Sequence, residues 1–178
     1  MGKVSSIHAQ SGADSVQMVA PGSSKPVSSR APLRTITRWG RDSAPLNTGV
    51  PHAVIFVPEA DQAPVQKLGA EVRYHPAFAP KGTNVNFVKV TGPSAITVRT
   101  YERGVEDETL ACGTGSVASA IRMARLGRVT PPVAVRVRSG STLRIHFTLA
   151  GERASGVVLE GEAVVLFEGE LILSAFGY

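Results

Sequence analysis

The sequence predicts an α+β fold with one helix enclosed by a sheet. Many short segments alternate between apolar and polar residues, and only two segments have the periodicity of a helix. These two helices do not alternate regularly with the strands, as they would in a doubly wound parallel sheet. One of them, over residues 115–126, has small residues on most of its faces, which suits a helix that is packed closely on all sides.

The chain divides into two parts of different composition. Residues 1–45 are rich in Ser, Pro, Gly and Ala and show little periodicity, so we expect a partly irregular leader with at most short strands near Val16 and Leu33. From residue 46 the composition is that of a folded domain, which we place at residues 46–178.

Within this domain the predicted elements follow one another closely. A helix is expected over residues 61–73, with Asp61 as its N-cap and Pro64 in its first turn. The helix over residues 115–126 ends at Gly127, a residue suited to the position after a helix. Strands are predicted at residues 52–57, 84–90, 95–101, 133–138, 142–148, 157–159, 163–167 and 170–174.

Composition excludes several classes of protein. Hydrophobic residues make up 43% and charged residues 19% of the chain, as in ordinary globular proteins. No apolar run approaches the roughly 20 residues that cross a bilayer, and residues 1–20 lack the apolar segment of a secretory signal. We therefore expect no membrane association. A single cysteine excludes an internal disulfide and fits a reducing compartment, so we expect the cytoplasm.

The net charge of +5 raises the question of a nucleic-acid partner. The basic residues are scattered through the leader, the second helix and several strands, and no nucleic-acid-binding motif accompanies them. We predict no nucleic-acid partner. A basic surface would also steer a small dianionic substrate.

The only cysteine, Cys112, directly precedes the second predicted helix in the segment Thr-Leu-Ala-Cys-Gly-Thr-Gly. Unpaired backbone N–H groups and the helix dipole favour a thiolate there, so the pKa of Cys112 is expected to fall below about 8.5. Gly113 and Gly115 let a small anionic group approach the backbone closely. The segment thus combines a reactive sulfur with an anion-binding turn.

Residues 101–115 resemble the C-terminal cysteine motif of the diaminopimelate epimerase family. Three further segments resemble the family in the same order: Asn-Thr-Gly-Val-Pro-His-Ala-Val at residues 47–54, Gly-Thr-Asn-Val-Asn-Phe at residues 82–87 and Phe-Glu-Gly-Glu at residues 167–170. The resemblance covers roughly residues 45–174.

The resemblance implies an epimerase of lysine and peptidoglycan-precursor biosynthesis that uses neither pyridoxal phosphate nor a metal, and hence no cofactor. Its members interconvert LL- and meso-2,6-diaminopimelate. Two similar domains, each an antiparallel-rich sheet wrapped around a central helix, face each other across a cleft. Each contributes one cysteine: one thiolate removes the α-proton, and the other thiol delivers a proton to the opposite face.

By this resemblance Cys112 is one of the two acid/base thiols. The α-proton of an amino acid is weakly acidic, so the negative charge that develops must be held by donors already in place. The backbone N–H groups of Gly113 and Thr114 would supply such donors.

The remaining expected site residues come from other segments. Arg103 would pair with a substrate carboxylate, and Glu102 would tune the cysteine or bind an amine. Asn84 would hydrogen-bond the distal end of the substrate. His52 would lie near the sulfurs and modulate their pKa.

The chain departs from the family pattern in two places. It has no second cysteine, and residues before Asn47 contain no Cys-Gly-Asn-Gly motif. We therefore expect a C-terminal half whose leader is a remnant of the preceding domain, with exposed apolar surface at residues 164–176. Such a half would form a homodimer or pair with a chain that supplies the N-terminal domain. Val50 stands where many members have Asn, for which Asn47 is a candidate substitute.

Three alternatives remain open at this point. A Cys-His hydrolase would need a base within hydrogen-bond reach of the sulfur. A related racemase or isomerase that acts without pyridoxal phosphate would share the fold. A catalytically incomplete fragment or partner-binding half-domain would explain the single cysteine.

Overall fold

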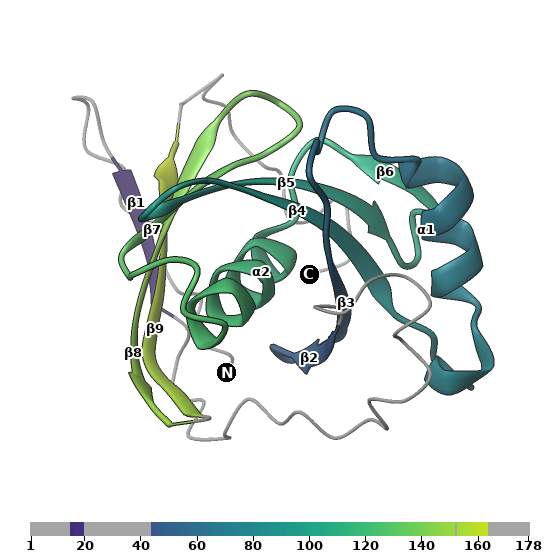
Figure 1. The fold of residues 1–178 in the computed structure, drawn as a ribbon, viewed down its shortest axis with the longest axis horizontal. Helices are drawn as coiled ribbons and strands as arrows, with labels where there is room; N and C mark the ends of the chain where they lie inside the picture. Colours follow the sequence, from purple (N-terminus) through teal and green to yellow (C-terminus); the bar gives the residue numbers. More distant parts are fainter. Residues whose placement is uncertain (1–14, 20–43, 152, 164–178) are drawn as a thin grey trace, which may run out of the picture.

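The computed structural model describes residues 15–19, 44–151 and 153–163, which form one mixed sheet that curls around a helix (Figure 1). The strands are β1 (Ser15–Val19), β2 (Ala44–Asn47), β3 (Pro51–Phe56), β4 (Asn84–Gly92), β5 (Ala95–Glu102), β6 (Asp107–Thr109), β7 (Val133–Arg136), β8 (Thr142–Ala150) and β9 (Arg153–Glu162). The helices are α1 (Val65–Arg73), the short 3-10 helix η3 (Pro76–Phe78) and α2 (Gly113–Arg125).

The sheet has the order β1-β9-β8-β7-β5-β4-β3-β2, and β6 pairs with β5 beside this path. Only the β3–β4 and β5–β7 pairs are parallel among the described strands. The α+β fold with an antiparallel-rich sheet around a central helix is therefore confirmed.

Helix α2 lies on the inner face of the curled sheet (Figure 1). Its fully buried Ala118, Ile121 and Met123 pack in one core with Val54 and Val98 of the sheet. The helix begins two residues earlier than the sequence predicted. Cys112 has an extended backbone, with φ −133° and ψ 107°, and occupies the N-cap position, so Gly113 and Thr114 are already helical.

Helix α1 covers the opposite, outer face of β4 and β5, where it forms a second apolar cluster (Figure 1). Gly69 allows this close packing, because a Cβ at that position would lie 2.5 Å from the Cβ of Tyr101. The predicted start of this helix is wrong: Pro64, not Asp61, is the N-cap. The guanidinium of Arg99 donates to the carbonyl of Asp61 at 2.9 Å, which holds that residue in a turn outside the helix.

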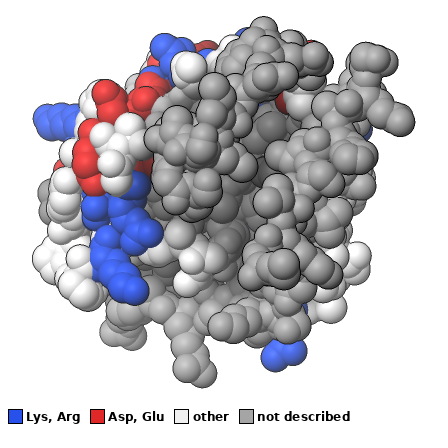
Figure 2. Space-filling model, turned by 180° about the vertical axis from the view of Figure 1, so that it is seen from behind, with Lys and Arg blue, Asp and Glu red and all other residues white. Residues whose placement is uncertain are grey.

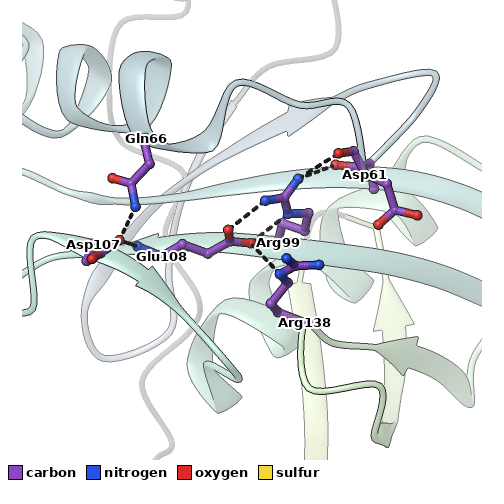
Figure 3. A network of polar contacts seen from close by, with 7 residues as sticks. Asp61, Gln66, Arg99, Asp107, Glu108 and Arg138 are labelled. Atoms are coloured by element: carbon purple, nitrogen blue, oxygen red, sulfur yellow. Dashed lines mark hydrogen bonds and ion pairs between the residues drawn. The ribbon is translucent and has the colours of Figure 1, made fainter.

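The acidic segment at residues 106–108, where no strand was predicted, is partly strand. Asp107–Thr109 forms β6, and Glu108 makes a bidentate ion pair with Arg99 of β5 at 2.6 Å for both bonds (Figure 3). The exposed fractions of the two side chains are 14% and 12%. Arg138 lies 3.7 Å from the same carboxylate, and Gln66 of α1 contacts Asp107.

Other predicted elements agree with the structure or fall outside its described residues. β1 is the short strand expected near Val16, and it pairs with β9. The strand predicted at residues 163–167, apart from residue 163, the strand predicted at residues 170–174, the apolar segment at residues 164–176 and most of the leader lie outside the described residues. Neither α1 nor α2, the longer helices of the described part, has the length and apolar character needed to cross a membrane.

Candidate active site

The inner face of the sheet changes from apolar to polar along three neighbouring strands. Because side chains alternate between faces with a period of two, a polar residue two positions before or after an inner apolar residue shares its face. His52 precedes Val54 on β3, Asn86 precedes Val88 on β4, and Thr100 follows Val98 on β5. Asn84 and Glu102 extend the same polar zone by one further position.

The polar zone faces the start of α2. A Cβ built on Gly115 would lie 2.3 Å from Oδ1 of Asn86 and 3.2 Å from Sγ of Cys112. The asparagine, the cysteine and the first turn of the helix are therefore neighbours in space. The polar zone of β3, β4 and β5 and the N-terminal turn of α2 together form the candidate active site.

Cys112 is a free thiol with an exposed fraction of 8%. Its Sγ lies 3.6 Å from the hydroxyl oxygen of Thr114, and its carbonyl accepts bonds from the backbone N–H and the hydroxyl of Ser116, each at 2.9 Å.

The direction predicted for the pKa of this thiol is wrong. Burial raises the pKa of Cys112, and the negative charge of Glu102 raises it further, while hydrogen bonds from Thr114 and from the backbone of Gly115 lower it. Burial outweighs the helix N-terminus because the sulfur is enclosed between helix and sheet, where a thiolate loses its hydration. In this structure Cys112 is a protonated thiol near neutral pH.

His52, the second residue of β3, is completely buried. Its Nδ1 lies 3.1 Å from Nδ2 of Asn86. Burial lowers the pKa of His52 to about 4, and the positive charge of Arg103 contributes in the same direction. The imidazole is therefore neutral near pH 7.

Asn84 joins β4 to two neighbouring segments. Its Nδ2 donates to the carbonyl of Pro51 at 3.1 Å, and its Oδ1 accepts from the backbone N–H of Arg103 at 2.9 Å. The asparagine thereby fixes the backbone of Arg103 at the end of β5. The Arg103 guanidinium donates to the carbonyl of Lys81 at 3.4 Å.

Glu102 accepts a hydrogen bond from the hydroxyl of Thr109 at 2.9 Å, which ties β5 to the segment that leads into Cys112. On the face seen from behind, one column of Lys and Arg atoms lies below a group of Asp and Glu atoms (Figure 2).

The structure thus brings the sequence-predicted residues into one region. The negative charge of Glu102 raises the pKa of Cys112, and the positive charge of Arg103 lowers the pKa of His52. Asn84 holds the backbone of Arg103 in place. Gly113 and Thr114 form the first turn of α2. Asn47 instead accepts from the backbone N–H of Gly49 at 2.9 Å, within the turn before β3, so its role as a substitute for Asn at position 50 stays a prediction.

Sequence reasoning missed Asn86 and Thr100. Asn86 is completely buried, and it accepts a hydrogen bond from the Thr100 hydroxyl at 3.0 Å. A signal was present: on a strand, an asparagine two residues after Asn84 must point to the same face.

The chemistry available here is proton transfer by a thiol beside backbone donors. A substrate carboxylate at the helix start would meet N–H groups that lack partners within the helix, and the neutral imidazole adds a donor. Within the described ranges, no three His, Cys, Asp or Glu side chains are grouped as metal ligands would be.

Comparisons with known proteins identify the family of this chain. The family model described as diaminopimelate epimerase matches residues 45–166. The chain is similar to the diaminopimelate epimerase of Chlorobaculum tepidum, with 46% identity over 129 residues that cover 72% of this chain and 49% of that protein. It is also similar to the diaminopimelate epimerase of Aquifex aeolicus, with 50% identity over 127 residues, 71% of this chain and 44% of that protein.

A solved hydroxyproline epimerase from Agrobacterium vitis matches with a TM-score of 0.47 and 21% identity, over 67% of this chain and 42% of that one. The chain spans about half the length of the curated relatives it matches. Because the family model covers residues 45–166, more than half of the sequence, the chain belongs to the diaminopimelate epimerase family.

Proposed function

We propose that residues 46–178 form one half of an amino-acid epimerase site that interconverts LL- and meso-2,6-diaminopimelate without a cofactor. One observation carries the proposal: Cys112 occupies the N-cap position of α2 directly beside the polar end of the inner sheet face, in a chain of the diaminopimelate epimerase family. A buried acid/base group next to unpaired backbone donors is what proton transfer at an α-carbon requires.

In the proposed reaction the substrate α-carboxylate binds the N–H groups of Gly113 and Thr114. A thiolate takes the α-proton, and the electron pair of the broken C–H bond spreads into the carboxylate, where these donors stabilise it. A thiol on the opposite face then gives its proton to the α-carbon.

Three side chains would hold the rest of the substrate. Arg103 pairs with a carboxylate, Glu102 binds an amine or tunes Cys112, and Asn84 hydrogen-bonds the distal end. The support is their placement: the polar zone carries Glu102 and Asn84, and Asn84 anchors the backbone of Arg103. Opposite charges of this kind match a substrate with two carboxylates and two amines.

Inversion of a stereocentre needs a group on each face of the carbon, and the sequence contains one cysteine. We infer that a partner supplies the second group, either another copy of this chain or a chain that carries the family's N-terminal domain. We place the reaction in the cytoplasm, where a free thiol stays reduced.

The test is proton NMR of LL-diaminopimelate incubated with the purified chain in D₂O. We expect the α-proton signal to disappear with the chain and to persist with Cys112→Ala, because only the thiol exchanges the proton. L-Lysine, which lacks the distal carboxylate, serves as the control substrate and should exchange more slowly. Persistence of the signal with a folded chain and its partner present would refute the proposal.

The single cysteine also favours a second candidate, a partner-binding half-domain without turnover. In that case exchange would be absent from this chain alone under every condition, while a partner would still bind. A Cys-His hydrolase is disfavoured, because a histidine with a pKa of about 4 is a poor base near neutral pH.

A further inference from the structure

Three buried side chains form a hydrogen-bonded row across β5, β4 and β3. The Thr100 hydroxyl donates to Oδ1 of Asn86 at 3.0 Å, and Nδ2 of Asn86 lies 3.1 Å from Nδ1 of His52 and 3.3 Å from the carbonyl of Ala53. Thr100 has an exposed fraction of 4%, and Asn86 and His52 are completely buried. Water therefore cannot substitute for any of these bonds.

The orientation of the Asn86 amide follows from the carbonyl of Ala53. A carbonyl only accepts hydrogen bonds, so the group that faces it must be the amide NH₂. The second N–H of that group then donates to Nδ1 of His52, which must carry a lone pair. In a neutral imidazole the proton therefore lies on Nε2.

Nε2 of His52 is buried and has no hydrogen-bond partner among the described residues. A buried donor without a partner destabilises the folded chain, so a group that accepts its bond would be favoured there. The low pKa of His52 keeps the ring neutral, and Arg103 is the charged group that acts on it.

We propose that Asn86 is a positioning residue that fixes His52 as the Nε2–H tautomer, so that the site presents a neutral donor to an anionic group bound there. The anionic group is a carboxylate or a thiolate, and this part of the inference rests on the proposed function. The fixed tautomer does not depend on that function.

The same asparagine contacts the start of α2. A Cβ built on Gly115 would lie 2.3 Å from Oδ1 of Asn86 and 3.2 Å from the sulfur of Cys112. One amide group thus touches both the histidine and the helix turn that carries the cysteine. Asn86 sets the position of these two groups relative to each other.

The test reads the tautomer directly, by long-range proton–nitrogen NMR of the ligand-free chain labelled with ¹⁵N-histidine near neutral pH. The sequence has 4 histidines, and His52→Gln identifies the signals of this one. We expect unprotonated Nδ1 and protonated Nε2 in the wild type. In Asn86→Asp the carboxylate can only accept, so Nδ1 should become protonated.

Asn84→Asp is the matched control, because it adds the same charge to the same face of β4 without a bond to the imidazole. It should leave Nδ1 unprotonated. If Asn86→Asp does not fold, Asn86→Ala, which adds no charge, should give a mixture of both tautomers. A protonated Nδ1 in the wild type, an unprotonated Nδ1 in Asn86→Asp, or protonation in both Asp variants would overturn the inference.

Diaminopimelate added to the wild-type chain should then shift the Nε2 signal. A fixed tautomer with no response to diaminopimelate would overturn the donor role and count against the proposed function, while the tautomer assignment would stand. If the wild-type chain lacks the Nε2–H tautomer of His52 but still exchanges the α-proton of diaminopimelate, only the role of Asn86 is refuted.

Discussion

Replacement of Gly115 by Ala tests whether the start of α2 is pressed against the sheet as the structure indicates. The new Cβ would lie 2.3 Å from Oδ1 and 3.3 Å from Cγ of Asn86. Real Cβ atoms do not approach other atoms so closely, so the helix start or the asparagine must move. A movement of the asparagine disturbs the hydrogen bond from Thr100 to Asn86, and a movement of the helix start disturbs the packing of α2 on the sheet.

The magnitude follows from two opposing effects. Overpacking of a well-packed core costs about 1–3 kcal/mol. A Gly→Ala change at a compatible backbone position returns about 0.4–1 kcal/mol by restricting the unfolded chain. The net expectation is a free energy of unfolding lower by about 1–2 kcal/mol.

Gly113→Ala is the matched control in the same helical turn. Its Cβ would meet only Cδ1 of Leu159, at 3.2 Å, the far end of a flexible side chain. This variant should be unchanged or up to about 1 kcal/mol more stable than the wild type. Urea unfolding followed by circular dichroism measures all three chains. A Gly115→Ala chain as stable as Gly113→Ala would refute the close contact between α2 and Asn86.

Three further predictions concern charge. The pKa of His52 falls from 6.5 to about 4 on folding, so the unfolded chain takes up a proton first as the pH falls. The free energy of unfolding should therefore decrease by about 3 kcal/mol between pH 6.5 and pH 4. Urea titrations at a series of pH values should show that His52→Gln removes this dependence of stability on pH. Glu108→Gln, which weakens the half-buried ion pair with Arg99, should cost about 1.5–3 kcal/mol in the same assay. Glu59→Gln, at a more exposed ion pair, should cost less than about 1 kcal/mol, and equal losses would contradict the role of burial. Alkylation of Cys112 by iodoacetamide should have its pH midpoint above that of free cysteine, and a lower midpoint would show that the helix N-terminus outweighs burial.

Much of the fold could be predicted from local sequence because strands and helices have distinct periods. The strands at β3, β4 and β5 and the enclosed helix α2 follow directly from the apolar pattern. The start of α1 could not be predicted, because Asp61 is a good N-cap by type and only the distant Arg99 holds it in a turn. β6 was missed for the same reason, since its acidic residues are stabilised by a cation from another strand.

The site divides in the same way. Cys112, Gly113 and Thr114 are adjacent in sequence, so their chemistry could be read from one segment. The direction of the cysteine pKa could not, because it depends on how deeply the sheet buries the sulfur. The bond between Asn86 and His52 joins residues 34 positions apart and appears only when β3 and β4 pair.

The inner sheet face has an apolar and a polar zone on the same strands, so the packing of the apolar residues also fixes the strand register of the site. His52 lies opposite Asn84, and Val54 opposite Asn86, in the parallel β3–β4 pair. A shift of β4 by one residue would turn both asparagines outward, and it would also remove Val88 from the core around α2. An error in the site thus carries the energetic penalty of an error in the core, so the core selects the one alignment in which the polar groups meet.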